Sequence, residues 1–261
     1  MSDNTPEQNE TAQQEARDSG SILAFLAAKK VGTAMWVMRW YTVILSIQYM
    51  FFCSAFEMGQ YFQRAIVANA VVCALRLHQR VPQFRFSREH LALLTQEDSC
   101  HYLIFSMIFL SCHPITIALM PVIVFGVLHA SSFTRQIMDM HGSNSYPFAR
   151  KIINHIAKNQ AVLFRFTALN EILLMPTVFM MLISGRATLF APFLYYKFLQ
   201  YRYLSRRNPY SRMVFYELRM VAESMSRNPN CPQFLASLII RMISAISNLA
   251  PSVQPEQQQQ Q

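Results

Sequence analysis

The chain has 261 residues and a formal net charge of +9, yet only 14% of its residues are charged, against roughly 25% in soluble globular domains. From Ser99 to Thr134, 36 residues pass without an Asp, Glu, Lys or Arg, and roughly 20 apolar residues suffice to cross a bilayer. Composition therefore excludes an ordinary soluble domain and predicts an all-α, polytopic helical membrane protein.

Both ends of the chain are polar. Residues 1–20 hold almost no large apolar side chain, and residues 252–261 end in five glutamines, so both are expected to be disordered. We divide the chain into a disordered polar tail over 1–30, a helical membrane domain over 31–207, a C-terminal amphipathic helical region over 208–251, and a disordered Gln-rich tail over 252–261.

The apolar residues of the membrane domain come in pairs of blocks. Short polar or Pro/Gly breaks at 57–60, 112–114 and 184–186 divide the pairs, and proline within a helix breaks or kinks it. We therefore predict three helical hairpins, whose legs are drawn from these blocks: 40–56, 65–75, 99–134, 160–184 and 187–203.

The positions of the basic residues orient these hairpins, because Lys and Arg favour cytosolic loops. The three breaks carry a single basic residue, Arg186, whereas 76–98, 135–158 and 202–212 are rich in Arg and Lys. A three-pass model, crossing near 40–56, 100–121 and 165–184, would leave both sides comparably basic, so we favour the hairpins. Legs too short to span would tilt, thin the bilayer or lie as wedges in one leaflet.

Polar side chains within apolar blocks are costly at the centre of a bilayer. The residues concerned are Arg64, Arg165, Asn170 and Glu171, together with Lys197. They could line a substrate or ion path. Alternatively, Glu171 is satisfied by a basic residue of a neighbouring leg, or lies near the interface. We favour the second interpretation, because only one acid is available for coupled transport.

The pair Cys-His occurs twice, at Cys100-His101 and Cys112-His113. On a helix, twelve residues separate the pairs by about 18 Å, and one zinc ion holds each of its ligands within about 2.3 Å. Adjacent Cys and His also point about 100° apart, which does not suit a catalytic pair. We expect structural roles, although one pair could still join a metal or redox site.

No recognisable catalytic motif or cofactor fingerprint occurs, since GxGxxG, P-loop, GxSxG and HExxH patterns are all missing from the sequence. We expect no enzymatic activity, cofactor or metal. The basic residues cluster beside membrane segments, so they are expected to attract anionic headgroups rather than nucleic acid.

The segment 232–251 predicts a helix that lies in the membrane surface. Ser237, Arg241, Ser244 and Asn248 recur at helical spacing and form a narrow polar stripe. With one charge, the segment is too polar to span but suits the cytosolic leaflet surface; the alternative is a helix packed on the protein's own membrane bundle. The expected membrane-facing residues are Phe234, Leu235, Leu238, Ile239, Met242, Ile243, Ile246 and Leu249.

Several stretches resemble one known family. They are TAMWVMR (33–39), ALRLHQR (74–80), EDSCHYL (97–103), GSNS (142–145), NEILLMP (170–176) and SRRNPY (205–210). They are similar to the Krüppel homolog 2 / transmembrane protein 33 family, over roughly Thr33 to Pro251, and more distantly to fungal pore-membrane proteins.

This resemblance implies a multi-pass protein of the endoplasmic reticulum membrane and nuclear envelope. It implies membrane organisation through the lipid bilayer, reticulon-like partners and nuclear pore components, with a link to reticulum stress signalling. It implies no catalytic residues, and C-terminal amphipathic helices are expected within 209–250. The alternative function is a small-molecule or ion channel or transporter of the reticulum membrane.

Overall fold

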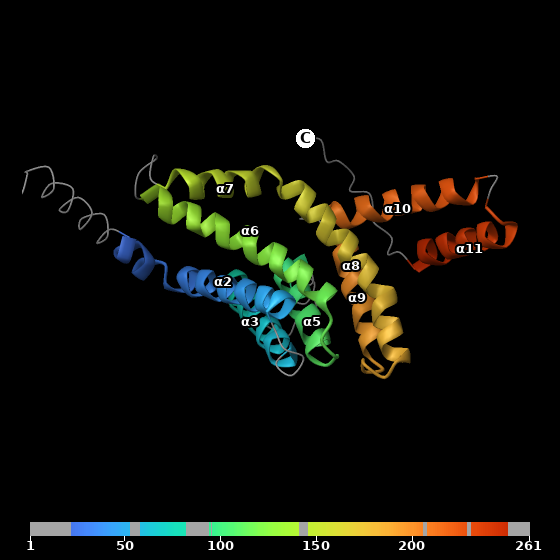
Figure 1. Ribbon diagram of the computed structural model, residues 1–261, viewed down its shortest axis with the longest axis horizontal. Helices are drawn as coiled ribbons and strands as arrows, with labels where there is room; N and C mark the ends of the chain where they lie inside the picture. Colours follow the sequence, from blue (N-terminus) through green and yellow to red (C-terminus); the bar gives the residue numbers. More distant parts are fainter. Residues whose placement is uncertain are drawn as a thin grey trace, which may run out of the picture. The chain divides into compact units, whose positions relative to one another are not determined.

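The computed structural model describes residues 22–52, 58–81, 94, 96–140, 146–205, 208–228 and 231–249. Every regular element among these residues is a helix, which confirms the all-α prediction (Figure 1). The predicted disorder of residues 1–21 and 252–261 concerns positions outside the described residues. The helices are α2 (Lys30–Phe51), α3 (Met58–Arg80), α5 (Asp98–Leu110), α6 (Thr116–Met140), α7 (Pro147–Lys158), α8 (Gln160–Ile183), α9 (Ala191–Leu204), α10 (Tyr210–Ser226) and α11 (Gln233–Leu249).

Among the described residues, α6 and α8 are the two helices long and apolar enough to cross a membrane. Each contains a proline, Pro121 in α6 and Pro176 in α8, and each continues through it. The helices α2 and α3 have similar lengths but mix polar and charged residues among their apolar ones. The number of membrane crossings therefore stays a prediction.

A short helix precedes α2. Residues 22–28, which sequence analysis assigned to the polar tail, are helical. The ring of Phe25 lies 6.0 Å from that of Phe133 in α6, and the Lys29 ammonium lies 4.4 Å from the centre of the Phe25 ring. This aromatic contact gives residues 22–28 something to pack against, and they are rich in good helix formers.

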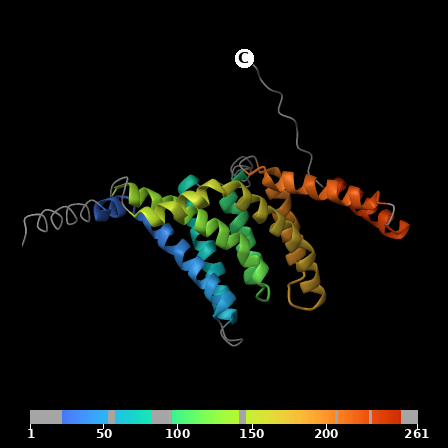
Figure 2. The same cartoon turned by 45° about the horizontal axis from the view of Figure 1, so that its top comes forward.

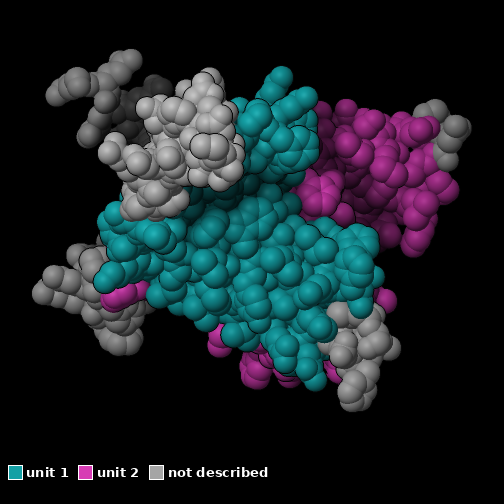
Figure 3. All heavy atoms as spheres, turned by 60° about the vertical axis from the view of Figure 1, so that its left-hand side comes forward, with its two compact units in different colours: residues 1–75, 114–163 teal, residues 76–113, 164–261 magenta. Residues whose placement is uncertain are grey.

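The chain divides into two compact units, one of residues 1–75 and 114–163 and one of residues 76–113 and 164–261 (Figure 3). In unit 1, α2 packs along α6 and α7 packs on α6 (Figure 1). The Trp36 indole N–H donates to the Thr134 hydroxyl at 2.9 Å. The ring of Tyr49, near the end of α2, lies tilted against that of Phe62 in α3, with ring centroids 5.7 Å apart, so α2 and α3 touch at this point.

A glycine sets the spacing of α2 and α6. A Cβ added to Gly126 would lie 2.8 Å from Val43 Cγ2, closer than side-chain carbons approach, and 3.7 Å from the Arg39 carbonyl oxygen. Val43 itself is 3% exposed. Small residues at such crossings let membrane helices approach closely, which increases their van der Waals contact.

In unit 2, an aromatic core joins α5 to α9. Phe105 and Phe109 of α5 lie against Tyr195 and Phe198 of α9, with ring centroids 5.3 to 6.2 Å apart across the two helices. Aromatic rings bury large apolar areas and prefer such tilted arrangements. Helices α8 and α9 lie side by side and are joined by a short turn (Figure 2).

That turn begins at Gly185, whose φ of +69° is the left-handed conformation. The Arg186 N–H donates to the Met181 carbonyl at 2.8 Å, and the Gly185 N–H donates to the Leu182 carbonyl at 3.0 Å. This pair of bonds is the Schellman motif that ends many helices. Glycine adopts a positive φ without the steric cost that a side chain would add.

The turns after α5 and α8 meet. The His113 N–H donates to the Arg186 carbonyl at 2.9 Å. At the opposite ends of α5 and α9, Ser205 Oγ donates to Asp98 at 3.2 Å. Within unit 2, the residues predicted to face the lumen therefore gather at one end, and those predicted to face the cytosol gather at the other.

Candidate functional site

The predicted surface helix forms as α11 and packs on α10. Ile239 and Ile243 are half-buried together with Ala236, which identifies one face of α11, with helical spacing, as the face covered by α10. The other predicted residues are exposed, except that the side chain of Leu249 lies outside the described part of the chain. We define the α11 strip as Phe234, Leu235, Leu238, Met242 and Ile246, whose exposed fractions range from 43% to 74%.

Of the predicted membrane-facing residues whose side chains are described, five are exposed, and two, Ile239 and Ile243, are turned towards α10. Ile240 is 58% exposed as well and was not predicted. Arg241 is the single charged residue of α11. An apolar strip with so little charge matches a helix that inserts among acyl chains rather than one that is drawn to headgroup charge.

Helix α10 takes part in exposed ion pairs. Arg165 of α8 donates to Glu217 at 2.6 Å, and both side chains are about half exposed, 51% and 44%. Arg219 donates to Glu223 at 2.8 Å, and this hydrogen bond lowers the pKa of the Glu223 carboxyl below its usual value. Arg165 therefore has an acidic partner on a surface helix, where the sequence analysis had expected a costly intramembrane charge.

A buried ion network lies at the centre of unit 2. The Arg202 side chain donates from Nε to Glu171 Oε2 at 2.9 Å and from Nη1 to Asp98 Oδ1 at 3.1 Å. Arg202 and Glu171 are 0% and 1% exposed. A buried charge without a partner costs several kcal/mol, so each of these groups depends on the other.

Two tyrosines complete the network. The Tyr102 hydroxyl donates to Glu171 Oε1, and the Tyr195 hydroxyl donates to the Glu171 backbone carbonyl at 2.7 Å. The Arg202 guanidinium also lies 5.3 Å from the centre of the Tyr102 ring. Helices α5, α8 and α9 are thus joined through one carboxylate, and the geometry supports a structural role for it.

Glu171 therefore pairs with a basic residue of a neighbouring leg, as the favoured interpretation of the sequence allowed, rather than lying unpaired near the interface. The partner, Arg202, had been assigned to a cytosolic loop instead. A faint signal was present in the sequence, since Arg202 stands between Tyr201 and Tyr203 in an otherwise apolar stretch. An arginine flanked by aromatic residues can bury its charge where an acid is available.

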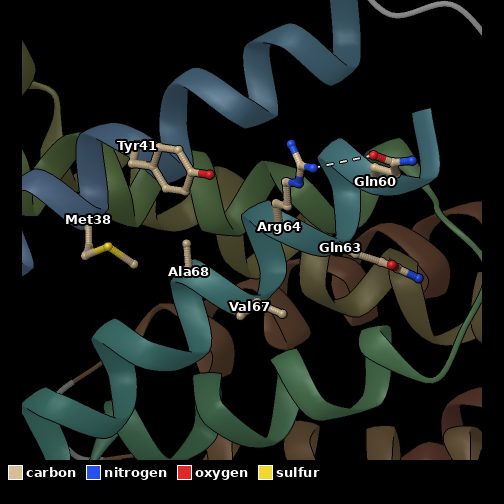
Figure 4. Close-up of a pocket in the computed structure, with 7 residues that line it drawn as sticks. All are labelled: Met38, Tyr41, Gln60, Gln63, Arg64, Val67 and Ala68. Atoms are coloured by element: carbon tan, nitrogen blue, oxygen red, sulfur yellow. Dashed lines mark hydrogen bonds between the residues drawn. The ribbon is translucent and has the colours of Figure 1, made fainter. Parts of the chain in front are cut away.

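The two remaining intramembrane candidates have few polar contacts among the described residues. The side-chain oxygen of Asn170 is buried without a hydrogen-bond partner there. Among the described residues, Arg64 of α3 donates only one long hydrogen bond, from Nη2 to Gln60 Oε1 one turn earlier, at 3.5 Å. It lies in an open groove of unit 1 between α2 and α3 (Figure 4).

The two Cys-His pairs lie at opposite ends of α5. Cys100 and His101 lie in the first turn of α5, whereas Cys112 and His113 follow its last residue, Leu110. The His101 ring is buried and stacks on Tyr201 at 5.8 Å. The described residues contain no group of three or more His, Cys, Asp or Glu side chains that could hold a metal ion. A structural role for these pairs stays a prediction.

Comparison with known proteins places these features in context. The model of the family described as Transmembrane protein 33/Nucleoporin POM33 matches residues 14–252. Transmembrane protein 33 of Homo sapiens is 45% identical over 230 residues, which cover 88% of this chain and 93% of the relative. Krueppel homolog 2 of Drosophila melanogaster is 38% identical over 234 residues, or 90% of this chain and 84% of its own. No solved structure matches the chain.

Proposed function

The chain belongs to the Transmembrane protein 33/Nucleoporin POM33 family, and from this premise we propose that it organises the membranes of the endoplasmic reticulum and nuclear envelope. The resemblance drawn from six short motifs is thereby confirmed. In the proposed mechanism, apolar helices anchor the protein and the α11 strip inserts into one leaflet. The protein further contacts reticulon-like proteins and nuclear pore components, and it is linked to reticulum stress signalling.

The α11 strip is the observation that carries this proposal. Full burial of a large apolar side chain is worth about 1.5–3 kcal/mol, so half-burial of the five strip residues gives a gross gain of about 5 kcal/mol. Because α11 already packs on α10, part of the entropy cost of ordering the helix is met before it reaches the lipid. Insertion along one leaflet widens that leaflet and favours curvature.

The network in unit 2 supports a structural protein over a transporter or an enzyme. Glu171, the one acid that could couple transport, is held by Arg202, Tyr102 and Tyr195. Membrane transporters commonly keep such carboxylates on a water-filled path. The family's name includes a nucleoporin, which supports nuclear pore components as one class of partner.

A triple substitution tests the α11 strip in the complete protein. The variant combines Leu235→Ser, Leu238→Ser and Met242→Ser. It makes the strip polar but keeps the contacts of Ile239 and Ile243 with α10. In cells lacking the protein, this variant should integrate into membranes but fail to restore the tubule-to-sheet ratio of the reticulum. The matched control changes the polar stripe instead, by Ser237→Asn, Ser244→Asn and Asn248→Ser, and should restore it fully.

In nanodiscs of neutral lipid, hydrogen exchange should show α11 protected in the wild type and control, but not in the strip variant. Protection should survive high salt, because Arg241 is the only charge on the helix and salt screens charge rather than apolar contact. A strip variant that restores reticulum shape as well as the wild type would refute this role of α11.

A further inference from the structure

A groove in unit 1 combines an apolar wall with an arginine. It has a volume of about 480 Å³ and lies between α2 and α3. Met38 and Tyr41 of α2 and Val67 of α3 form its apolar part, while Gln60, Gln63 and Arg64 supply its polar groups (Figure 4). The polar groups lie one to two turns nearer the start of α3 than Val67, so the groove has a polar end and an apolar end.

Arg64 has no acidic partner among the described residues, so its guanidinium is available to an anion from outside the chain. Its side chain is exposed, its one hydrogen bond is the 3.5 Å contact with Gln60, and no described carboxylate lies within ion-pair distance of it. A guanidinium carries five N–H donors and binds phosphate in a bidentate manner. The amide groups of Gln60 and Gln63 add further donors on the same helix.

The surface around the groove is apolar. Val37 and Ile44 of α2 are each 52% exposed, and Val67 and Val71 of α3 are 46% and 41% exposed. These residues recur at the spacing of one helix face, and an exposed apolar face on a helix hairpin of a membrane protein contacts acyl chains. A single cation on such a face matches an amphipathic ligand, which holds its anion and its hydrocarbon in one molecule.

We propose that this groove binds an anionic phospholipid. The lipid phosphate accepts hydrogen bonds from the Arg64 guanidinium and from the Gln60 and Gln63 amides, and the start of an acyl chain lies on Met38, Tyr41 and Val67. Charge complementarity selects the lipid headgroup, and the apolar wall distinguishes a phospholipid from a free phosphate. The groove is formed by other residues than the α11 strip, so this proposal does not depend on membrane insertion of α11.

Native mass spectrometry of the full-length protein in detergent tests this site, with phosphatidylserine and phosphatidylcholine of identical acyl chains as probes. Both lipids carry the phosphate, but the choline ammonium cancels its charge, whereas phosphatidylserine keeps a net negative charge. The first phosphatidylserine should therefore bind the wild type about tenfold more tightly than phosphatidylcholine, the preference expected from one uncompensated charge contact. Arg64→Gln should abolish that preference. Arg135→Gln, an exposed arginine of α6 in the same unit, is the matched control and should keep it.

Two further arms separate the possible occupants. Val67→Trp fills the apolar end of the groove while keeping Arg64, and it should also weaken binding of phosphatidylserine. Inorganic phosphate at the same concentration should not compete, because it lacks the hydrocarbon part. Equal losses in Arg64→Gln and Arg135→Gln, competition by phosphate, or a wild type without headgroup preference would each overturn the proposal.

Discussion

Unit 1 and unit 2 hold their helices together by different means. In unit 1, α2 and α6 approach at Gly126, and side-chain bonds such as the one from Trp36 to Thr134 lie at part-buried positions. In unit 2, a full ion pair is buried between α8 and α9, and tyrosines surround it. Helices in membranes gain little from hydrophobic burial against each other, so they associate through close packing or through interhelical polar bonds. Both means occur in each unit, but the closest helix approach described lies in unit 1 and the fully buried ion pair lies in unit 2.

The difference also concerns what each unit can tolerate. Close packing fails when a side chain grows, whereas a buried ion pair fails when one partner is lost. Substitutions that enlarge a residue should therefore affect unit 1 most, and substitutions that remove a charge should affect unit 2 most. Three predictions follow this contrast, beginning with the largest expected effect.

Loss of Arg202 should give the largest effect. Arg202→Leu leaves Glu171 buried without its cation, and breaking a buried pair costs about 3–5 kcal/mol. We expect a large fall in the melting temperature of the detergent-solubilised protein and in its cellular level. Arg165→Leu, which breaks the exposed pair with Glu217, is the control and should cost at most about 1 kcal/mol.

The double variant Arg202→Leu with Glu171→Leu sharpens this prediction. Removing both charges leaves no unpaired ion, so much of the lost stability should return. For the same reason, Glu171→Gln should be tolerated better than Glu171→Lys, which places a second cation beside Arg202. Equal losses of stability in Arg202→Leu and Arg165→Leu would show that burial does not increase the contribution of the Arg202–Glu171 pair to stability.

Enlargement of Gly126 should give an intermediate effect, this time in unit 1. The new Cβ of Gly126→Ala would lie 2.8 Å from Val43 Cγ2, and overpacking of this kind costs about 1–3 kcal/mol. Gly59→Ala adds the same atom where nothing lies within 4 Å, so it should be neutral or slightly stabilising. Val43→Ala should partly rescue Gly126→Ala in thermal unfolding. If Gly126→Ala and Gly59→Ala behave alike, α2 and α6 are not held by close approach.

The exposed ion pair of α10 should give the smallest effect. Its hydrogen bond with Arg219 lowers the pKa of Glu223, so this carboxylate stabilises the fold at a pH above the ordinary carboxyl pKa. That contribution is lost as the pH falls through the lowered pKa, because protonation removes the pairing. Thermal unfolding of Glu223→Gln should therefore show a slightly weaker dependence on acid pH than the wild type. A variant with unchanged pH dependence would show that solvent screens the pair completely.

The helical class and the positions of the turns could be predicted from the sequence because they depend on local signals. Long uncharged runs and Pro or Gly breaks are visible within a few residues of chain, and the turns at 111–115 and 184–190 lie where such breaks occur. The break predicted at 57–60 was wrong for residues 58–60, which already belong to α3. Helix lengths could not be predicted as well. Helix α3 runs from Met58 to Arg80, far beyond the uncharged block 65–75, because long basic side chains extend their charges to the surface while the backbone stays helical.

The partner of Glu171 could not be predicted, because it lies 31 residues away on another helix. Its position follows from how α8 and α9 pair, and a single sequence carries no direct record of that pairing. The α11 strip could be predicted from its spacing, since the hydrophobic period is local. The period alone does not show which side chains of α11 are covered by α10, because that depends on tertiary packing. Ile239 and Ile243 were therefore predicted to face the membrane together with the exposed residues.

The bond between the two turns of unit 2 has an evolutionary consequence. It joins the His113 N–H to the Arg186 carbonyl, so only backbone atoms take part and nearly any amino acid could occupy either position. Proline at position 113 is the exception, because proline has no N–H to donate. Positions 113 and 186 can therefore vary in relatives while the same connection is kept, and the side chains at these two positions would give no sign that the two turns touch.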